Sequence, residues 1–203
     1  PPGYTLAWSG QFEYMERAIE RLKLVVPLTL VIITLLLYLA FNRVSDVLII
    51  LTSLPFAVAG SAWFVWYLGF DLSVAVAVGI IALAGVAVEI GVIMLIYLNQ
   101  YRQDYLDQLG PDEKPSLVGL QEAIQQGALQ RLRPIVMTVA AITAGLLPIM
   151  SGHGVGSEVM QRIAAPMIGG MISTLLLTLC VVPALYLVWQ NIEHGWHFEE
   201  AAD

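Results

Sequence analysis

Five long apolar runs constrain this sequence more than any other feature. Asp, Glu, Lys and Arg are absent from four of them, residues 24–42, 47–70, 134–157 and 163–192. The fifth run, residues 72–98, contains one charged residue, Glu89. A run of about 18 or more apolar residues is long enough for a helix to cross the hydrocarbon core of a bilayer. The sequence therefore predicts an all-α membrane protein with five transmembrane helices.

The composition excludes several classes of protein. Only 12% of the 203 residues are charged, whereas soluble domains contain about 25%. The formal net charge of −7 argues against nucleic acid as a partner, because a polyphosphate attracts basic proteins. The single cysteine, Cys180, lies within the last apolar run and has no partner for an internal disulfide. We expect it to act as a small buried apolar side chain.

The apolar runs also predict the domain organisation. The expected helices span about residues 24–41, 47–68, 72–98, 134–150 and 163–189, within a membrane domain of residues 24–192. Residues 99–133 form the longest polar connection, with a possible surface helix at 116–129. Residues 1–23 are polar and begin with Pro1, so we expect the chain to be part of a larger protein. Residues 193–203 form an acidic C-terminal tail.

Small residues recur at four-residue spacing in two of the predicted helices. Ala75 and Gly79 are four apart in the third helix, and Ala165, Gly169 and Ser173 follow the same spacing in the last. Such spacing lets two helix backbones approach closely within a membrane. The pattern predicts close helix packing at these positions.

Glu89 is the residue that most clearly indicates a function. It lies 17 residues after Leu72, which corresponds to about 25 Å along a helix. An ionisable side chain at that depth costs at least ~2.5 kcal/mol and is typical of ion paths and proton relays. The alternative is a protonated carboxyl group that only hydrogen-bonds to a neighbouring helix. We favour a role in proton transfer.

Other polar side chains give weaker signals. Thr138 and Thr143 could belong to a relay, although threonines in helices usually bond to their own backbone. Arg131 and Arg133, taken alone, are typical of interfacial anchors. The thioether of Met160 suits soft ions such as Cu(I), but a single methionine more often only packs.

Two histidine patterns are weaker still. His194 and His197 in the tail could bind a metal ion. His153 and Ser157 lie in a glycine-rich corner that lacks the Gly-x-Ser-x-Gly elbow of serine hydrolases. We therefore expect no enzymatic activity.

The order of several motifs resembles the C-terminal membrane half of the resistance–nodulation–division (RND) transporters. The resemblance covers residues 1–186. The matching segments are residues 8–14 with 24–27, 81–89, 131–138, 145–148, 156–160 and 162–170. These segments are most similar to the heavy-metal efflux branch, and within it to copper/silver pumps of the Cus type.

The resemblance implies roles for individual residues. Glu89 occupies the position at which drug-efflux relatives have a lysine and cobalt–zinc–cadmium relatives an asparagine, which implies a proton relay through Glu89. More loosely, Arg131 and Thr138 match relay positions of drug-efflux relatives. Met160 matches a metal-relay methionine, which implies Cu(I) or Ag(I) as the transported ion. Ile135 stands where the Cus-type pumps have a relay lysine, so either Arg131 does that work here or the relay differs, and this departure also bears on the metal preference.

The resemblance also implies the architecture and partners of the whole protein. The five helices would be the eighth to twelfth of twelve, and residues 1–23 would end a periplasmic pore domain. The protein would be a homotrimer in a bacterial inner membrane, joined to a periplasmic adaptor and an outer-membrane channel, and would hold no cofactor. The alternatives are an RND pump for divalent metals or drugs, or an unrelated five-helix membrane protein.

Membrane orientation follows from the arginines that flank the fourth helix. Arg131 and Arg133 precede it, and no Lys or Arg follows it before Arg162. Because positive residues favour the cytoplasmic side, we expect residues 99–133 to be cytoplasmic and the corner at 151–161 periplasmic. With five spans, the N-terminus is then periplasmic and the C-terminus cytoplasmic.

Overall fold

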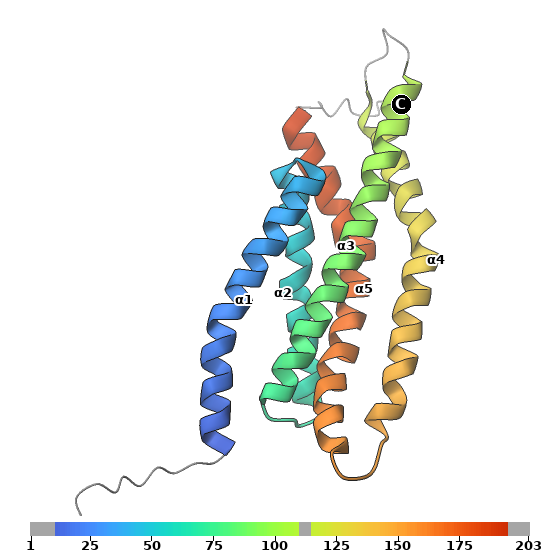
Figure 1. Ribbon diagram of the computed structural model, residues 1–203. Helices are drawn as coiled ribbons and strands as arrows, with labels where there is room; N and C mark the ends of the chain where they lie inside the picture. Colours follow the sequence, from blue (N-terminus) through green and yellow to red (C-terminus); the bar gives the residue numbers. More distant parts are fainter. Residues whose placement is uncertain (1–10, 110–114, 195–203) are drawn as a thin grey trace, which may run out of the picture. The chain divides into compact units, whose positions relative to one another are not determined.

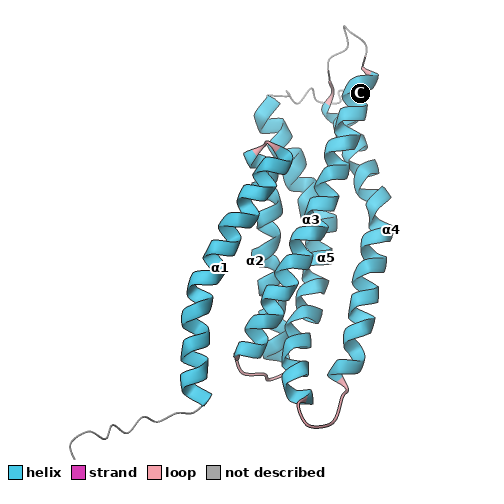
Figure 2. Cartoon of the chain, in the orientation of Figure 1, coloured by secondary structure: helices cyan, strands magenta, loops and turns pink. Residues whose placement is uncertain are grey.

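The computed structural model describes residues 11–109 and 115–194, and every regular element in these two ranges is a helix (Figures 1 and 2). The helices are α1 (Gln11–Phe41), α2 (Val44–Tyr67), α3 (Val74–Gln108), α4 (Leu117–Met150) and α5 (Ser157–His194). All five are long and apolar enough to cross a membrane. The predicted all-α fold with five transmembrane helices is confirmed.

The helices extend well beyond the apolar runs. Helix α3 continues ten residues past Leu98, and α4 begins 17 residues before Pro134. The surface helix expected at 116–129 is thus the first part of α4, continuous with the fourth apolar run. Most of the polar connection is helical because Gln, Glu, Leu and Ala, which are strong helix formers, dominate it. Residues 110–114 of this connection lie outside the described part of the structure.

Serine caps fix where α3 and α4 begin. The Ser73 hydroxyl accepts a hydrogen bond from the Val76 amide at 3.4 Å, and the Ser116 hydroxyl accepts one from the Gly119 amide at 3.1 Å. Each cap satisfies a backbone N–H that has no partner within its own helix. The Ser116 cap places the start of α4 well before its apolar run, whereas the Ser73 cap places the start of α3 two residues inside its run.

The chain divides into two units, residues 1–43 with α1 and residues 44–203 with α2 to α5. Helix α1 is a 31-residue helix with Pro27 inside it. In the second unit, α5 packs against α2, α3 and α4, and α3 also packs against α2 and α4 (Figure 1). Helix α5 is therefore the common partner of the other three helices in that unit.

The second unit has two ends with different connections. At one end α2 begins, α3 ends, α4 begins and α5 ends; we call this the long-loop end. At the other, the short-turn end, residues 68–73 join α2 to α3 and residues 151–156 join α4 to α5. Gly69 has a φ of 69° and Gly156 a φ of 86°, values that glycine adopts without the steric penalty that other residues incur.

Glycines let α5 contact its neighbours through backbone atoms. A Cβ atom on Gly79 of α3 would lie 2.3 Å from the Ile163 carbonyl oxygen of α5, and one on Gly169 of α5 would lie 2.7 Å from the Gly60 carbonyl oxygen of α2. Both distances are shorter than van der Waals contact. The close packing predicted at Gly79 and Gly169 is confirmed.

Serine hydroxyls add interhelical hydrogen bonds to these contacts. Ser61 of α2 donates to the Pro166 carbonyl oxygen at 2.7 Å, and Ser173 of α5 donates to the Phe56 carbonyl oxygen at 3.0 Å. Both bonds join α2 to α5. Such bonds matter in a bilayer, where lipid is as apolar as the helix surface and hydrophobic burial does not drive association.

One expectation for the last helix is wrong. Cys180 is exposed on the surface of α5 instead of being buried. The apolar run could not reveal this, because a helix in a membrane is apolar on its outer face as well as on its packed face.

We predict that Gly79→Ala destabilises the second unit and that Gly85→Ala does not. The added methyl group at position 79 meets the α5 backbone, which cannot move aside as a side chain can, so a loss of about 1–3 kcal/mol is expected. Gly85 lies on the same helix, and its Cβ would meet nothing within 4 Å. Thermal unfolding of the two variants in detergent, followed by size-exclusion chromatography, measures the difference. Equal stability of the two variants would contradict the α3–α5 backbone contact.

Candidate functional site

Glu89 lies within α3 on the surface of the second unit. It follows Val74, the first residue of the helix, by 15 positions, or about 22 Å along the axis. Its side chain is exposed and makes no hydrogen bond or ion pair within the described part of the chain. The alternative interpretation, in which the Glu89 carboxyl group only hydrogen-bonds to a neighbouring helix, is therefore not supported by any hydrogen bond among these residues.

The helix surface around Glu89 is open. A Cβ on Gly85, one turn earlier, would meet nothing within 4 Å. Val78 and Ile81 on the same side are each 45% exposed. By contrast, Leu83 and Ala87 are almost fully buried against neighbouring helices. Helix α3 thus has a packed face and an open face, and the carboxylate lies on the open one.

Thr138 and Thr143 both lie on α4 but have different surroundings. Thr138 is exposed, and its hydroxyl donates to the Pro134 carbonyl oxygen of its own helix at 3.1 Å. Thr143 is half-buried, and its hydroxyl donates to the Met171 sulfur at 3.9 Å. Neither contacts Glu89 in the structure.

Arg131 contacts α3 through an aromatic ring. Its guanidinium carbon lies 3.8 Å from the centre of the Tyr97 ring, which is a favourable cation–π geometry. Its Nε is buried and has no hydrogen-bond partner among the described residues. Tyr97 follows Glu89 by eight residues, or about 12 Å along α3. Because Arg131 contacts Tyr97, it lies at about this distance from Glu89 along the helix. Glu89, Arg131 and Thr138 are therefore on neighbouring helices without touching one another.

Ile135, at the position of the family lysine, is only 4% exposed. Its side chain packs inside the second unit, whereas Thr138, about 60° away around the α4 axis, is exposed. An apolar residue fits this position, and the relay proposed for this chain cannot use it.

Met160 lies in the first turn of α5 at the short-turn end, with 57% of its surface exposed. Its backbone N–H donates to the Gly156 carbonyl oxygen at 3.4 Å. Among the described residues, no three His, Cys, Asp or Glu side chains gather to form a metal site. Met160 is thus an accessible thioether without such a cluster among the described residues.

The histidine patterns gain no support from the structure. The Ser157 hydroxyl donates to the Gly154 carbonyl oxygen at 2.8 Å and makes no contact with His153. The His194 side chain and His197 lie outside the described part of the structure, which leaves the metal-binding interpretation of that pair untested.

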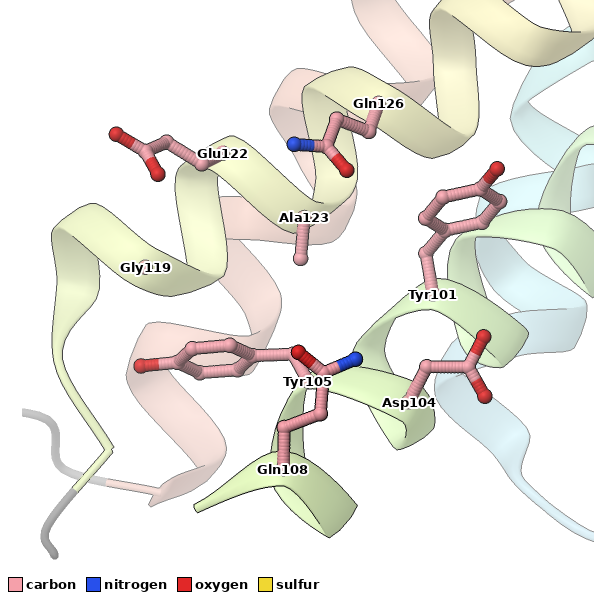
Figure 3. A pocket seen from close by; sticks show the side chains of 8 residues that line it. All are labelled: Tyr101, Asp104, Tyr105, Gln108, Gly119, Glu122, Ala123 and Gln126. Carbon is pink, nitrogen blue, oxygen red and sulfur yellow. The ribbon is translucent and has the colours of Figure 1, made fainter.

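A cavity of about 250 Å³ lies between α3 and α4 at the long-loop end (Figure 3). Tyr105 lies against Gly119, where a Cβ would be 2.4 Å from the tyrosine oxygen. The lining residues are polar for the most part: Tyr101, Asp104, Tyr105, Gln108, Gly119, Glu122, Ala123 and Gln126. The nearest of them in sequence, Tyr101, follows Glu89 by 12 residues. The cavity is therefore separate from the carboxylate site.

A buried polar cluster at the long-loop end was not predicted from the sequence. Its members are Asp46, Asn99, Arg102, Tyr186 and Gln190, which lie on α2, α3 and α5. The predicted spans 24–41 and 47–68 leave Asp46 between two helices, and the polar connection at 99–133 contains Asn99 and Arg102. The available signal was the four-residue spacing of Tyr186 and Gln190, which places both on one face of the last helix.

Together these features define a polytopic helical membrane protein with an ionisable group on an open face inside its span. The chain belongs to the AcrB/AcrD/AcrF family, whose model matches residues 1–190. The family inferred from the motifs is confirmed.

Individual relatives place the chain near the heavy-metal branch. It is 56% identical over 189 residues to the cation efflux system protein CusA of Escherichia coli K12, covering 93% of this chain and 18% of CusA. It is 38% identical over 186 residues to the cobalt-zinc-cadmium resistance protein CzcA of Cupriavidus metallidurans, covering 92% of this chain and 16% of CzcA.

A solved structure has the same arrangement of helices. The crystal structure of a heavy metal efflux pump matches with a TM-score of 0.75 and 34% identity, covering 94% of this chain and 18% of that one. The chain thus spans less than a fifth of the length of the proteins it matches.

Proposed function

We propose that this chain supplies the C-terminal membrane helices of a proton-driven pump that exports Cu(I) or Ag(I) from a bacterial cell. The observation that carries the proposal is the carboxylate of Glu89, exposed on the open face of α3 and without a partner among the described residues. A carboxylate inside a membrane span is suited to taking up and releasing protons. The greater identity to CusA than to CzcA supports the soft-metal branch.

In this mechanism, proton binding at Glu89 changes how α3 interacts with the helices that cover its open face. The charged form needs a polar or charged partner there, whereas the neutral form can face an apolar surface. Helix α3 meets the backbone of α5 at Gly79, so a movement of α3 is transmitted to α5. The first turn of helix α5 contains Met160. A movement of α5 therefore couples the Glu89 carboxylate to the short-turn end.

Arg131 and Thr138 have secondary roles in this proposal. Thr138 is exposed on α4, and its hydroxyl can extend a hydrogen-bonded path without carrying charge. Arg131 contributes a positive charge held against Tyr97. The loss of either weakens coupling less than the loss of Glu89.

Met160 contributes one ligand to the transported ion. A thioether prefers Cu(I) and Ag(I) to harder divalent ions. Because it is exposed at the short-turn end, it can receive the ion from ligands elsewhere in the pump. The metal is the cargo of the protein and not a resident cofactor.

The whole protein is proposed to be a homotrimer in the bacterial inner membrane, joined to a periplasmic adaptor and an outer-membrane channel. Residues 1–23 then end a periplasmic pore domain, the N-terminus is periplasmic and the C-terminus is cytoplasmic. The similarity to CzcA favours one alternative cargo, a divalent metal ion.

We predict that Glu89→Gln in the full-length pump abolishes resistance to copper and silver. The amide keeps the shape and hydrogen-bonding capacity of the side chain but cannot bind or release a proton at neutral pH. Growth inhibition by each metal, at matched expression, measures the loss. Asp71→Asn, which removes an exposed carboxylate from the turn between α2 and α3, should leave resistance unchanged. Full resistance in a well-expressed Glu89→Gln pump would refute the relay.

We predict that Met160→Ile selectively lowers copper and silver resistance. The substitution keeps the volume and removes the sulfur, and such exchanges usually cost under ~1.5 kcal/mol in stability. Met137→Ile is the matched control, because Met137 is 63% exposed on α4. Growth is measured with silver, copper and zinc. Unchanged tolerance of silver and copper would remove Met160 from the metal path, and an equal loss for zinc would favour the divalent cargo.

We predict opposite labelling of cysteines at the two ends of α4. In a Cys180→Ala background, Gln121→Cys should resist an impermeant thiol reagent added to intact spheroplasts, and Val155→Cys should react. Both positions are exposed, so a difference reports the side of the membrane. Labelling is followed by gel shift, with permeabilised cells as the control. The reverse pattern would overturn the proposed orientation.

A further inference from the structure

Three helices of the second unit are joined by a buried chain of polar side chains at the long-loop end. Asn99 of α3 donates from Nδ2 to Asp46 Oδ2 of α2 at 2.9 Å. The Tyr186 hydroxyl of α5 donates to Asn99 Oδ1 at 2.5 Å. Asp46 is 2% exposed and Tyr186 is fully buried. Both ends of the Asn99 amide are thus satisfied, each by a different helix.

A second polar contact lies one turn further along. Arg102 of α3 donates from Nη1 to Gln190 Oε1 of α5 at 3.0 Å. Arg102 is 7% exposed and Gln190 is 1% exposed. Asn99 and Arg102 therefore lie on one polar face of α3, and this face meets the face of α5 that contains Tyr186 and Gln190.

This cluster differs from the packed face of α3 nearer its centre. There the buried residues are apolar or small, such as Leu83, Ala87 and Gly91. Small apolar contacts tolerate a modest rotation or sliding of one helix on another, because they have little directionality. Hydrogen bonds depend on angle and distance, and an unmet polar group in the interior is costly. The polar cluster is therefore the part of α3 that specifies its rotation.

We propose that the Asp46–Asn99–Tyr186 chain is a clamp that fixes the rotation of α3 and thereby keeps Glu89 on the open face. Asp46 is a positioning residue in this proposal, which rests on the function assigned to Glu89 above. Asn99 follows Glu89 by ten residues, so the two are about 80° apart around the helix and about 15 Å apart along it. Holding Asn99 between α2 and α5 directs Glu89 away from them.

The clamp is tested by a disulfide between α2 and α3 close to Glu89. A Cβ on Gly91 would lie 3.8 Å from the Ser53 hydroxyl oxygen. Cysteines introduced by Ser53→Cys and Gly91→Cys are therefore close enough to form a disulfide, and position 91 is two residues from Glu89. The pair is built into the full-length pump with Cys180→Ala. The rate of disulfide formation under mild oxidation is measured in membranes. Gly85→Cys with Ser53→Cys is the negative control, because Gly85 faces open space.

Loss of the clamp should slow this cross-link. We expect Asp46→Ala to lower the rate by about threefold or more, the change that corresponds to one interhelical hydrogen bond. Tyr186→Phe removes a single hydroxyl and keeps the ring, so it serves if Asp46→Ala fails to accumulate as a folded pump. An unchanged rate in Tyr186→Phe and in folded Asp46→Ala would overturn the proposal.

An exchange of the two side chains distinguishes a clamp from a general packing role. Asn99→Asp alone places two carboxylates against each other and should slow the cross-link. Adding Asp46→Asn restores the chain, because the amide at position 46 donates to the carboxylate at position 99, which still accepts from Tyr186. The double variant should recover the original rate, and failure to recover it would overturn the proposal.

The cross-link does not depend on transport, so the clamp and the proposed function can fail separately. Glu89→Gln should abolish metal resistance and leave the cross-linking rate unchanged. Asp46→Ala should lower both, and the exchanged double variant should recover both. Full resistance in Asp46→Ala together with a slowed cross-link would overturn the link from Asp46 to Glu89. Full resistance in Glu89→Gln would instead refute the proposed relay without touching the clamp.

Discussion

The backbone contact between α3 and α5 is the constraint on which the rest of the second unit depends. Gly79 lets α3 approach the Ile163 carbonyl of α5, and Gly169 lets α5 approach α2 in the same way. Within a bilayer these contacts replace the hydrophobic burial that holds soluble helices together. They join α5 closely to two of the three helices that it packs against, so that a displacement of α3 or α2 also displaces α5.

This packing explains why Glu89 can remain a lone carboxylate. Near the centre of α3, the face that meets α2 and α5 is filled by small and apolar residues, and the carboxylate is left on the face that the other helices of the second unit do not cover. In the proposed mechanism, the cost of a charge in hydrocarbon drives the change, because the open face needs a polar partner when Glu89 is ionised and can lose it when Glu89 is protonated. The buried polar contacts at the long-loop end hold α3 in the rotation that this requires.

The sequence predicted the number and approximate positions of the helices correctly, but it did not predict the residue at which α3 ends or the residue at which α4 begins. Length and hydrophobicity alone identify a membrane span, because a helix must satisfy every backbone group internally in lipid. The ends of α3 and α4 depend instead on Ser73 and Ser116, whose hydroxyls cap backbone amides, and on helix-forming residues outside the apolar runs. Cys180 was misplaced because hydrophobicity does not separate the lipid-facing side of a membrane helix from its packed side.

Residue order alone was enough to predict the fold class and the family, and a single charge in an apolar run was enough to identify Glu89. The direction in which each side chain faces became clear only from the packing of the helices. In the packed structure, Glu89 faces outward and Ile135 inward. Arg131 and Thr138 lie apart from Glu89. Hydrogen bonds join three helices through Asp46, Asn99 and Tyr186. These outcomes depend on how the helices rotate against one another, and that rotation is set by contacts between residues as far apart as 117 positions in the chain.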